Sequence, residues 1–220
     1  MDLWAQFDGY CERTDLTFWS EPLNALTNAA FLIAALVMWQ RTRGADLPIA
    51  SLLCLILAAI GIGSFLFHTF ATGWAALADV IPIGLFILLY LFAVGRDFLG
   101  LPVWVAAILA LAFGPYAYLM LPLLDSLPFF RISDFYWTVP ILLVAFIPFV
   151  MRTNLTTAQG MLIGAAVLCA SITLRSVDEP LCAQFRIGTH IFWHALNAVM
   201  LGWMIEVYRR HMLAGETARV

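Results

Sequence analysis

Three of the four histidines in this chain lie inside long apolar stretches, where ionisable side chains are costly and are rarely kept without a partner or a role. His190 and His194 are four residues apart, so a helix places both imidazoles on one face. This is the spacing of zinc ligands on helices. His68 ends an earlier apolar stretch. We predict that it completes a metal site with this pair.

Two other polar residues accompany the histidines. Ser64 precedes His68 by one helical turn, and Asp79 lies just inside the next apolar stretch. We predict that both belong to the same buried metal site. Simpler interpretations exist, because paired histidines can join helices by hydrogen bonds and a helical serine can bond its own backbone. Asp79 lies too far along its stretch to cap a helix start.

Composition indicates a membrane protein. The chain is 63% hydrophobic and 11% charged, with a mean hydropathy of +0.93, whereas an average soluble domain is about 25% charged. A soluble fold of 220 residues cannot bury that much apolar surface. The net charge of -3, from 11 basic and 14 acidic residues, offers no basic patch for nucleic acid. The first twenty residues are acidic and polar, so we expect no cleavable signal peptide.

Seven apolar segments are long enough to cross a bilayer as helices. The connections between them are mostly short and contain turn residues, so neighbouring helices should pack antiparallel. We predict an all-α membrane protein, a bundle of seven transmembrane helices. Its parts are an acidic N-terminal segment at 1–21, a transmembrane domain at 22–208 and a short cytoplasmic tail at 209–220. The predicted spans are 22–40, 48–71, 74–95, 101–121, 133–151, 158–175 and 187–208.

Arginine placement predicts the orientation of this bundle. In a seven-span arrangement, the side with more arginines faces the cytoplasm. That side carries Arg41, Arg43, Arg96, Arg152, Arg209, Arg210 and Arg219, and the other carries Arg13, Arg131, Arg175 and Arg186. The N-terminus is therefore expected outside and the C-terminus in the cytoplasm. The three histidines, Ser64 and Asp79 then share one depth near the outer face.

The N-terminal segment gathers four carboxylates within a short stretch: Asp8, Glu12, Asp15 and Glu21. Calcium binds clustered oxygen ligands of this kind, so the cluster is a candidate calcium site. The alternative is a solvated acidic segment with Arg13 as its internal counter-ion. Asn24 and Asn28, four residues apart in the first span, are expected to face the bundle interior.

Two cysteines lie in polar segments on the predicted outer face. Cys11 precedes the first span and Cys182 precedes the last. An outer compartment permits a disulfide between them, and two free thiols are the alternative. Cys54 and Cys169 lie within spans and are expected to be inert apolar residues.

Several short motifs together resemble the alkaline ceramidase family, which belongs to a wider superfamily of seven-helix membrane hydrolases and hydrolase-like receptors. The similarity runs from about residue 8 to about residue 208, and the short loops are more similar to the bacterial members. The motifs are Asp8-Gly-Tyr-Cys-Glu-Arg13, Glu21-Pro-x-Asn24-x-x-x-Asn28, Ser64-x-x-x-His68, Asp79, a loop that contains Asp178, and His190-x-x-Trp-His194.

The resemblance implies a catalytic zinc held by His68, His190 and His194, with the fourth position open to water. Asp79 would orient or deprotonate that water and later pass a proton to the leaving amine. Ser64 would donate to the oxyanion at the amide carbonyl or help to hold the metal shell. The implied reaction is hydrolysis of a ceramide-like amide to a fatty acid and a sphingoid base, with the lipid entering from the bilayer.

The resemblance also implies a calcium ion held by the acidic N-terminal segment and a disulfide that joins this segment to the loop before the last helix. The chain departs from the family pattern in two places. The gap between Cys11 and Glu21 is shorter, and Asp8 lies one residue further from the cysteine. These departures affect which acids would bind calcium.

Two functions follow as expectations. The first is a zinc-dependent amidase in a bacterial inner membrane with its site toward the periplasm. The second is a seven-helix lipid-binding or receptor-like protein in which zinc has a structural role. A retinal protein is excluded because the chain has no lysine for a Schiff base. The sequence does not distinguish ceramide from other long-chain amides and does not predict an oligomeric state.

Overall fold

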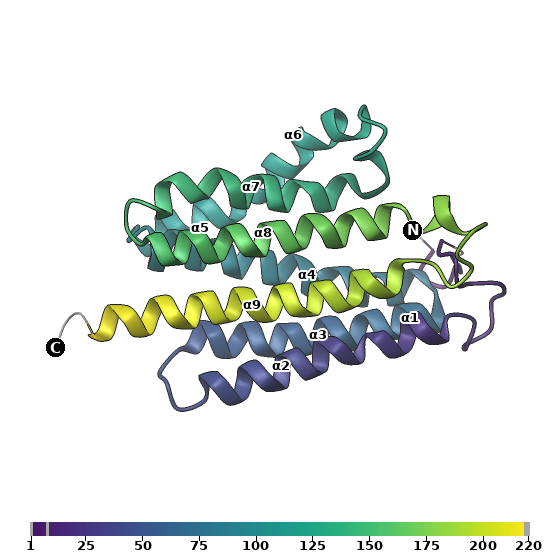
Figure 1. The fold of residues 1–220 in the computed structure, drawn as a ribbon, viewed down its shortest axis with the longest axis horizontal. Helices are drawn as coiled ribbons and strands as arrows, with labels where there is room; N and C mark the ends of the chain where they lie inside the picture. The colour runs from purple at the N-terminus through teal and green to yellow at the C-terminus, as the bar shows by residue number, and fades with distance from the viewer. Residues whose placement is uncertain (1, 8, 218–220) are drawn as a thin grey trace.

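The computed structural model describes residues 2–7 and 9–217 as a bundle of long helices running side by side (Figure 1). Within these residues there is no strand, and an isolated antiparallel bridge joins Gln6 to Thr72. The α-helices are α1 (Pro22–Thr27), α2 (Ala29–Thr42), α3 (Pro48–Phe70), α4 (Gly73–Ala93), α5 (Val103–Leu111), α6 (Phe113–Asp125), α7 (Asp134–Val150), α8 (Leu155–Ser176) and α9 (His190–Thr217). Short turns of other helix types are η1 (Val94–Phe98), η2 (Arg131–Ser133) and η3 (Glu179–Leu181).

Six helical stretches are long and apolar enough to cross a membrane: Pro22–Thr42, Pro48–Phe70, Gly73–Phe98, Val103–Asp125, Arg131–Val150 and Leu155–Ser176. The prediction of a multi-span, all-α protein is confirmed at this level, and each stretch coincides with a predicted span. The last helix, α9, has 28 residues and is long enough to span as well. It is less apolar because it carries His190, His194, Asn197 and Glu206.

Two of the predicted spans are interrupted helices. The first breaks between α1 and α2 at Asn28, whose side-chain amide donates to the carbonyl of Asn24 (2.8 Å) in place of regular backbone bonding. The fourth breaks between α5 and α6 at Ala112. Pro115 follows, and a proline removes a backbone donor and clashes with the carbonyl four residues earlier.

The α3–α4 pair is the most closely packed part of the bundle around the site. A Cβ atom on Gly63 of α3 would collide with the backbone carbonyl of Ala78 on α4, so glycine is needed for the two backbones to approach. Ser64 follows Gly63 and Asp79 follows Ala78. The close approach therefore brings the two predicted site residues together from different helices.

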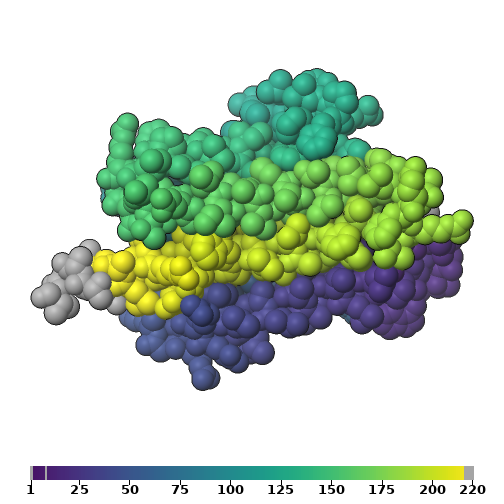
Figure 2. Space-filling view, viewed as in Figure 1, coloured from purple at the N-terminus to yellow at the C-terminus, as the bar shows by residue number. Residues whose placement is uncertain are grey.

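Helix α9 lies between two groups of helices. In Figure 2 it forms a yellow band with α2 and α3 on one side and α7 and α8 on the other. The helix continues through residues 209–217, which were predicted as a tail. Glu206 supports this extension by accepting hydrogen bonds from Arg209 and Arg210, three and four residues further along.

The N-terminal segment covers one end of the bundle. Backbone hydrogen bonds tie it to the turn between α3 and α4: Phe7 N to Ala71 O (2.7 Å), Gly73 N to Ala5 O (3.2 Å) and Trp74 N to Leu3 O (2.9 Å). The start of α9 lies at the same end of the molecule (Figure 1). The end of α3, the starts of α4 and α9 and the N-terminal segment thus form one region.

Candidate metal centre

The three predicted histidine ligands come together at this end of the bundle. His68 comes from the last turn of α3, and His190 and His194 come from the first two turns of α9. Their ring centroids are 4.6–5.1 Å apart, and each ring offers a nitrogen within 4.8 Å of the others. All three side chains are buried. The cluster can hold a metal ion.

The hydrogen bonds of the cluster leave ring nitrogens free for a metal. His68 shares a hydrogen bond between Nδ1 and Glu21 Oε2 (2.6 Å), and His194 shares one between Nδ1 and Thr27 Oγ1 (2.8 Å). The buried atoms His194 Nε2 and His190 Nδ1 have no hydrogen-bond partner. Leaving such atoms unpaired is costly, and binding a cation removes that cost. Three imidazoles, two of them oriented by outer hydrogen bonds, are a donor set that suits zinc.

Ser64 and Asp79 lie beside the histidine cluster and line a cavity. Ser64 and His68 both lie close enough to the Asp79 carboxylate to interact with it. The structure therefore places all five predicted site residues in one region. Asp79 is not one of the three histidines spaced to hold a metal ion.

The cavity extends from these polar groups into the apolar interior. Its lining comes from α2, α3, α4, α6, α7, α8 and α9. Met204 lines its far part and follows His194 along α9 by roughly ten residues, or about 15 Å. The walls are almost entirely apolar, including Phe113, Leu142 and Met200. The cavity thus combines a mainly apolar lining with the polar side chains of Ser64 and Asp79.

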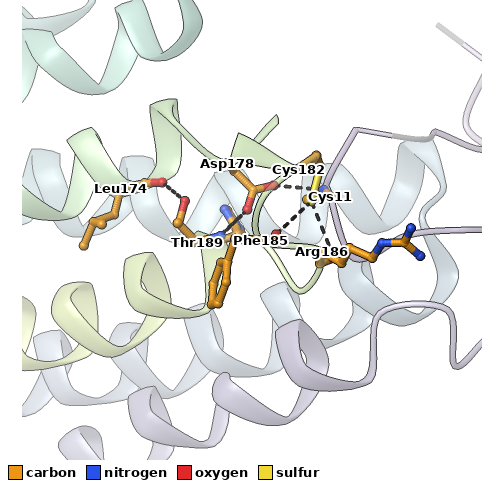
Figure 3. Close-up of a disulfide and its surroundings, with 8 residues drawn as sticks. Cys11, Leu174, Asp178, Cys182, Phe185, Arg186 and Thr189 are labelled. Carbon is orange, nitrogen blue, oxygen red and sulfur yellow. Dashed lines mark hydrogen bonds between the residues drawn. A yellow bond between two sulfur atoms is a disulfide. The ribbon is translucent and has the colours of Figure 1, made fainter. Parts of the chain in front are cut away.

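A single carboxylate anchors the start of α9 to the N-terminal segment (Figure 3). Asp178 accepts hydrogen bonds from the backbone N–H groups of Thr189 (2.6 Å), His190 (2.9 Å) and Cys11 (2.9 Å). Gly188 has a φ of +70°, and a Cβ atom there would collide with Asp178 and crowd Cys11. Asp178 therefore fixes the start of α9, and the two histidines of the pair lie in its first two turns.

A disulfide joins Cys11 to Cys182, as the resemblance implies, across 171 residues of sequence (Figure 3). It lies beside the Asp178 carboxylate, so a covalent and a hydrogen-bonded link connect the N-terminal segment to the loop before α9. Cys54 and Cys169 are free and belong to α3 and α8.

Removing the disulfide should destabilise the protein. We expect Cys182→Ala to lower the free energy of unfolding by about 2–4 kcal/mol, because the cross-link restricts a long loop in the unfolded chain. Thermal unfolding in detergent measures this loss, and Cys169→Ala, which removes a free thiol, is the control. Equal melting temperatures for Cys182→Ala and the unsubstituted protein would contradict the expectation, as would separately alkylated Cys11 and Cys182 in protein purified without reductant.

The acidic residues of the N-terminal segment are used in hydrogen bonds. Glu12 accepts from the backbone N–H groups of Leu23 and Asn24 (2.7 Å each) and so caps α1. Asp15 accepts from Thr17, which lowers the pKa of this exposed carboxyl. Among the described residues, the group spaced to hold a metal ion is the histidine cluster. Asp8 lies outside the described residues.

Glu21 contacts the histidine cluster directly. Its Oε2 atom bonds to His68 Nδ1 and accepts from Asn24 Nδ2 (3.0 Å), while Oε1 accepts from Arg13 Nε. Burial raises the pKa of this carboxyl, but the hydrogen bonds from His68 and Asn24 and the nearby Arg13 lower it below its usual value. The first span thus contributes to the histidine cluster through a carboxylate–histidine contact.

Sequence reasoning assigned no site role to Tyr10 or Arg175. The Tyr10 ring lies 4.0 Å from that of His190 and 5.0 Å from that of His68 (centroid distances), so it covers the cluster. Burial raises the pKa of its phenol, which stays protonated at neutral pH. The Arg175 guanidinium lies over the rings of Tyr136 and Trp193, both of which line the cavity. Tyr10 stood next to Cys11 in the sequence motif, and this adjacency was the available signal.

Neither a scan against protein-family models nor a search of curated proteins found a match to this chain. The similarity to the alkaline ceramidases rests on the sequence motifs described above.

Proposed function

We propose that this protein is a zinc-dependent intramembrane hydrolase that cleaves ceramide-like amides to a fatty acid and a sphingoid base. The observation that carries the proposal is the position of the histidine cluster. It lies with Asp79 and Ser64 at the polar end of a long apolar cavity inside a membrane-type bundle. A structural metal site requires neither a spare carboxylate nor an apolar space beside it.

In this proposal α9 is the seventh span, and the metal centre faces the outer side. Its length and its position within the bundle support a membrane-crossing role for α9. Arg41, Arg209 and Arg210 pair with Glu206 toward the C-terminal end of α9, opposite its histidines. An excess of arginine marks the cytoplasmic side, so the histidine end would lie toward the periplasm of a bacterial inner membrane.

When bound, a zinc ion supplies Lewis acidity toward the amide carbonyl and lowers the pKa of water to near neutrality. Asp79 accepts the proton of the attacking water and delivers it to the amine nitrogen as the C–N bond breaks. The Ser64 hydroxyl orients the Asp79 carboxylate or donates to the carbonyl oxygen of the substrate. The products are a carboxylate and an amine.

The cavity argues for a lipid amide as the class of substrate. The apolar part beyond Asp79 accommodates an acyl chain, and its walls come from helices that lie within the bundle. Polar groups are concentrated where the amide would lie, at Ser64, Asp79 and Tyr136. An amide near these groups would have its acyl chain directed along α9.

Incubation of purified protein with N-acyl sphingosines of different chain length tests the proposal. We expect zinc-dependent release of free fatty acid and sphingosine in equal amounts, with no release from the corresponding diacylglycerophospholipids. A chelator should abolish the release and added zinc should restore it. A protein that retains zinc and binds the lipids but releases no product would contradict the hydrolase. That outcome would favour the lipid-binding or receptor-like alternative.

A further inference from the structure

Arg13 is a buried arginine at the outer end of the bundle, directly behind the metal centre. Its side chain is 1% exposed. The guanidinium donates to three oxygen atoms: Nε to Glu21 Oε1 (2.5 Å), one terminal nitrogen to the carbonyl oxygen of His68 (3.1 Å) and the other to that of Asp15 (3.2 Å). All three oxygens accept these hydrogen bonds, and all three are hard ligand atoms of the kind that calcium binds.

These contacts connect Arg13 to His68 by two routes. The first runs through Glu21, whose second oxygen bonds to the imidazole at Nδ1. The second is direct, from the guanidinium to the backbone carbonyl of His68. A planar guanidinium fixes both groups at once because its donors have a rigid geometry. One side chain therefore holds the backbone of His68 directly and its ring through Glu21.

We propose that Arg13 is a positioning residue that occupies the place of a bound cation and holds the Glu21 carboxylate and His68 in metal-binding geometry without calcium. The proposal rests on the metal centre proposed above and not on any particular substrate. Glu12 supports it, since both of its carboxylate oxygens accept backbone hydrogen bonds at the start of α1. Both oxygens of Glu21 are also occupied.

The consequence is a metal centre with a built-in cation. Removing the guanidinium leaves Glu21 Oε1 and the carbonyl oxygens of His68 and Asp15 around a gap. A carboxylate that orients a metal-binding histidine usually changes metal affinity about 10–100-fold when it is disturbed. Filling the gap with a soluble cation should restore the geometry.

The test compares Arg13→Ala with Arg13→Lys and measures zinc affinity by competition with a chelator. We expect Arg13→Ala to bind zinc about 10–100-fold more weakly, and millimolar calcium or guanidinium to restore most of the loss. Arg13→Lys keeps the charge but loses the forked geometry, so its zinc affinity should be intermediate. The visible spectrum of the cobalt-substituted protein should shift in Arg13→Ala and return on rescue. Arg186→Ala, an exposed arginine in the loop before α9, is the matched control.

Unsubstituted protein should show no change in zinc affinity or melting temperature on addition of calcium or of a calcium-selective chelator. A calcium response in that protein would overturn the proposal. Wild-type zinc affinity and cobalt spectrum in Arg13→Ala would also overturn it. If Arg13→Ala does not fold, zinc affinity and the cobalt spectrum are measured on Arg13→Lys instead. Wild-type values for both in Arg13→Lys would overturn the proposal. None of these measurements uses hydrolysis, so they are independent of whether the amidase assignment holds.

Discussion

Replacing Asp79 with asparagine is expected to lower amide hydrolysis by about two to four orders of magnitude while zinc content stays unchanged. Asparagine keeps the shape of the side chain and can still bond to Ser64, but it cannot accept the proton of water. Asp79 lines the cavity and is not part of the group of three ligands. The effect should therefore fall on kcat and leave metal binding intact.

The measurement pairs turnover of an N-acyl sphingosine with metal analysis of the same sample. Asp125→Asn is the control, because Asp125 is an exposed carboxylate that pairs with Arg131 away from the cavity. Near-normal turnover in Asp79→Asn would remove this residue from the mechanism. Loss of zinc in that variant would assign Asp79 to metal binding instead.

The second large effect concerns the metal itself. We expect about one zinc ion per chain, and we expect His190→Ala and His194→Ala to remove most of it, because each substitution takes away one of three protein ligands. The two variants should also lose activity. The remaining histidine provides a matched control within α9. His211 bonds to Thr157 and to the backbone of Asp97, far from the cluster, so His211→Ala should retain its zinc.

Metal analysis after dialysis against a weak chelator measures this difference. Full zinc retention by both His190→Ala and His194→Ala would contradict the metal centre. Zinc loss in His211→Ala to the same extent would show that the metal depends on the fold of α9 in general. The cluster would then not be identified as the binding site.

The helical architecture could be predicted because the length of an apolar sequence stretch is enough to identify most membrane spans. Six predicted spans coincide with helices long and apolar enough to cross a membrane. The breaks at Asn28 and Ala112 were not predicted, since a membrane helix tolerates polar residues and prolines when local groups satisfy the backbone. The extension of α9 was missed because arginines such as Arg209 and Arg210 suggested a tail, whereas they stabilise a helical turn through Glu206.

The clustering of the three histidines could be predicted from their spacing along a helix and their predicted depth in the membrane. His190 and His194 are four residues apart, so they lie on one face of a helix. The predicted orientation of the bundle placed His68 at the same depth in the membrane. The surroundings could not be predicted in this way. Asp178 caps α9 and holds Cys11, and Arg13 reaches His68 across 55 residues of sequence. Such contacts depend on how loops fold over the bundle end, for which hydrophobic periodicity has no signal.

The distribution of the ligands along the chain constrains how the protein matures. His68 is synthesised early, with α3, whereas His190 and His194 are synthesised only with α9. Cys11 cannot form its disulfide until Cys182 has been synthesised. Chains fold progressively from the N-terminus during synthesis. Before α9 is made, the chain therefore lacks two of the three clustered histidines and also the α9 side chains that line the cavity, such as Met200 and Met204. If the protein is the proposed hydrolase, its activity can begin only after the last helix is in place.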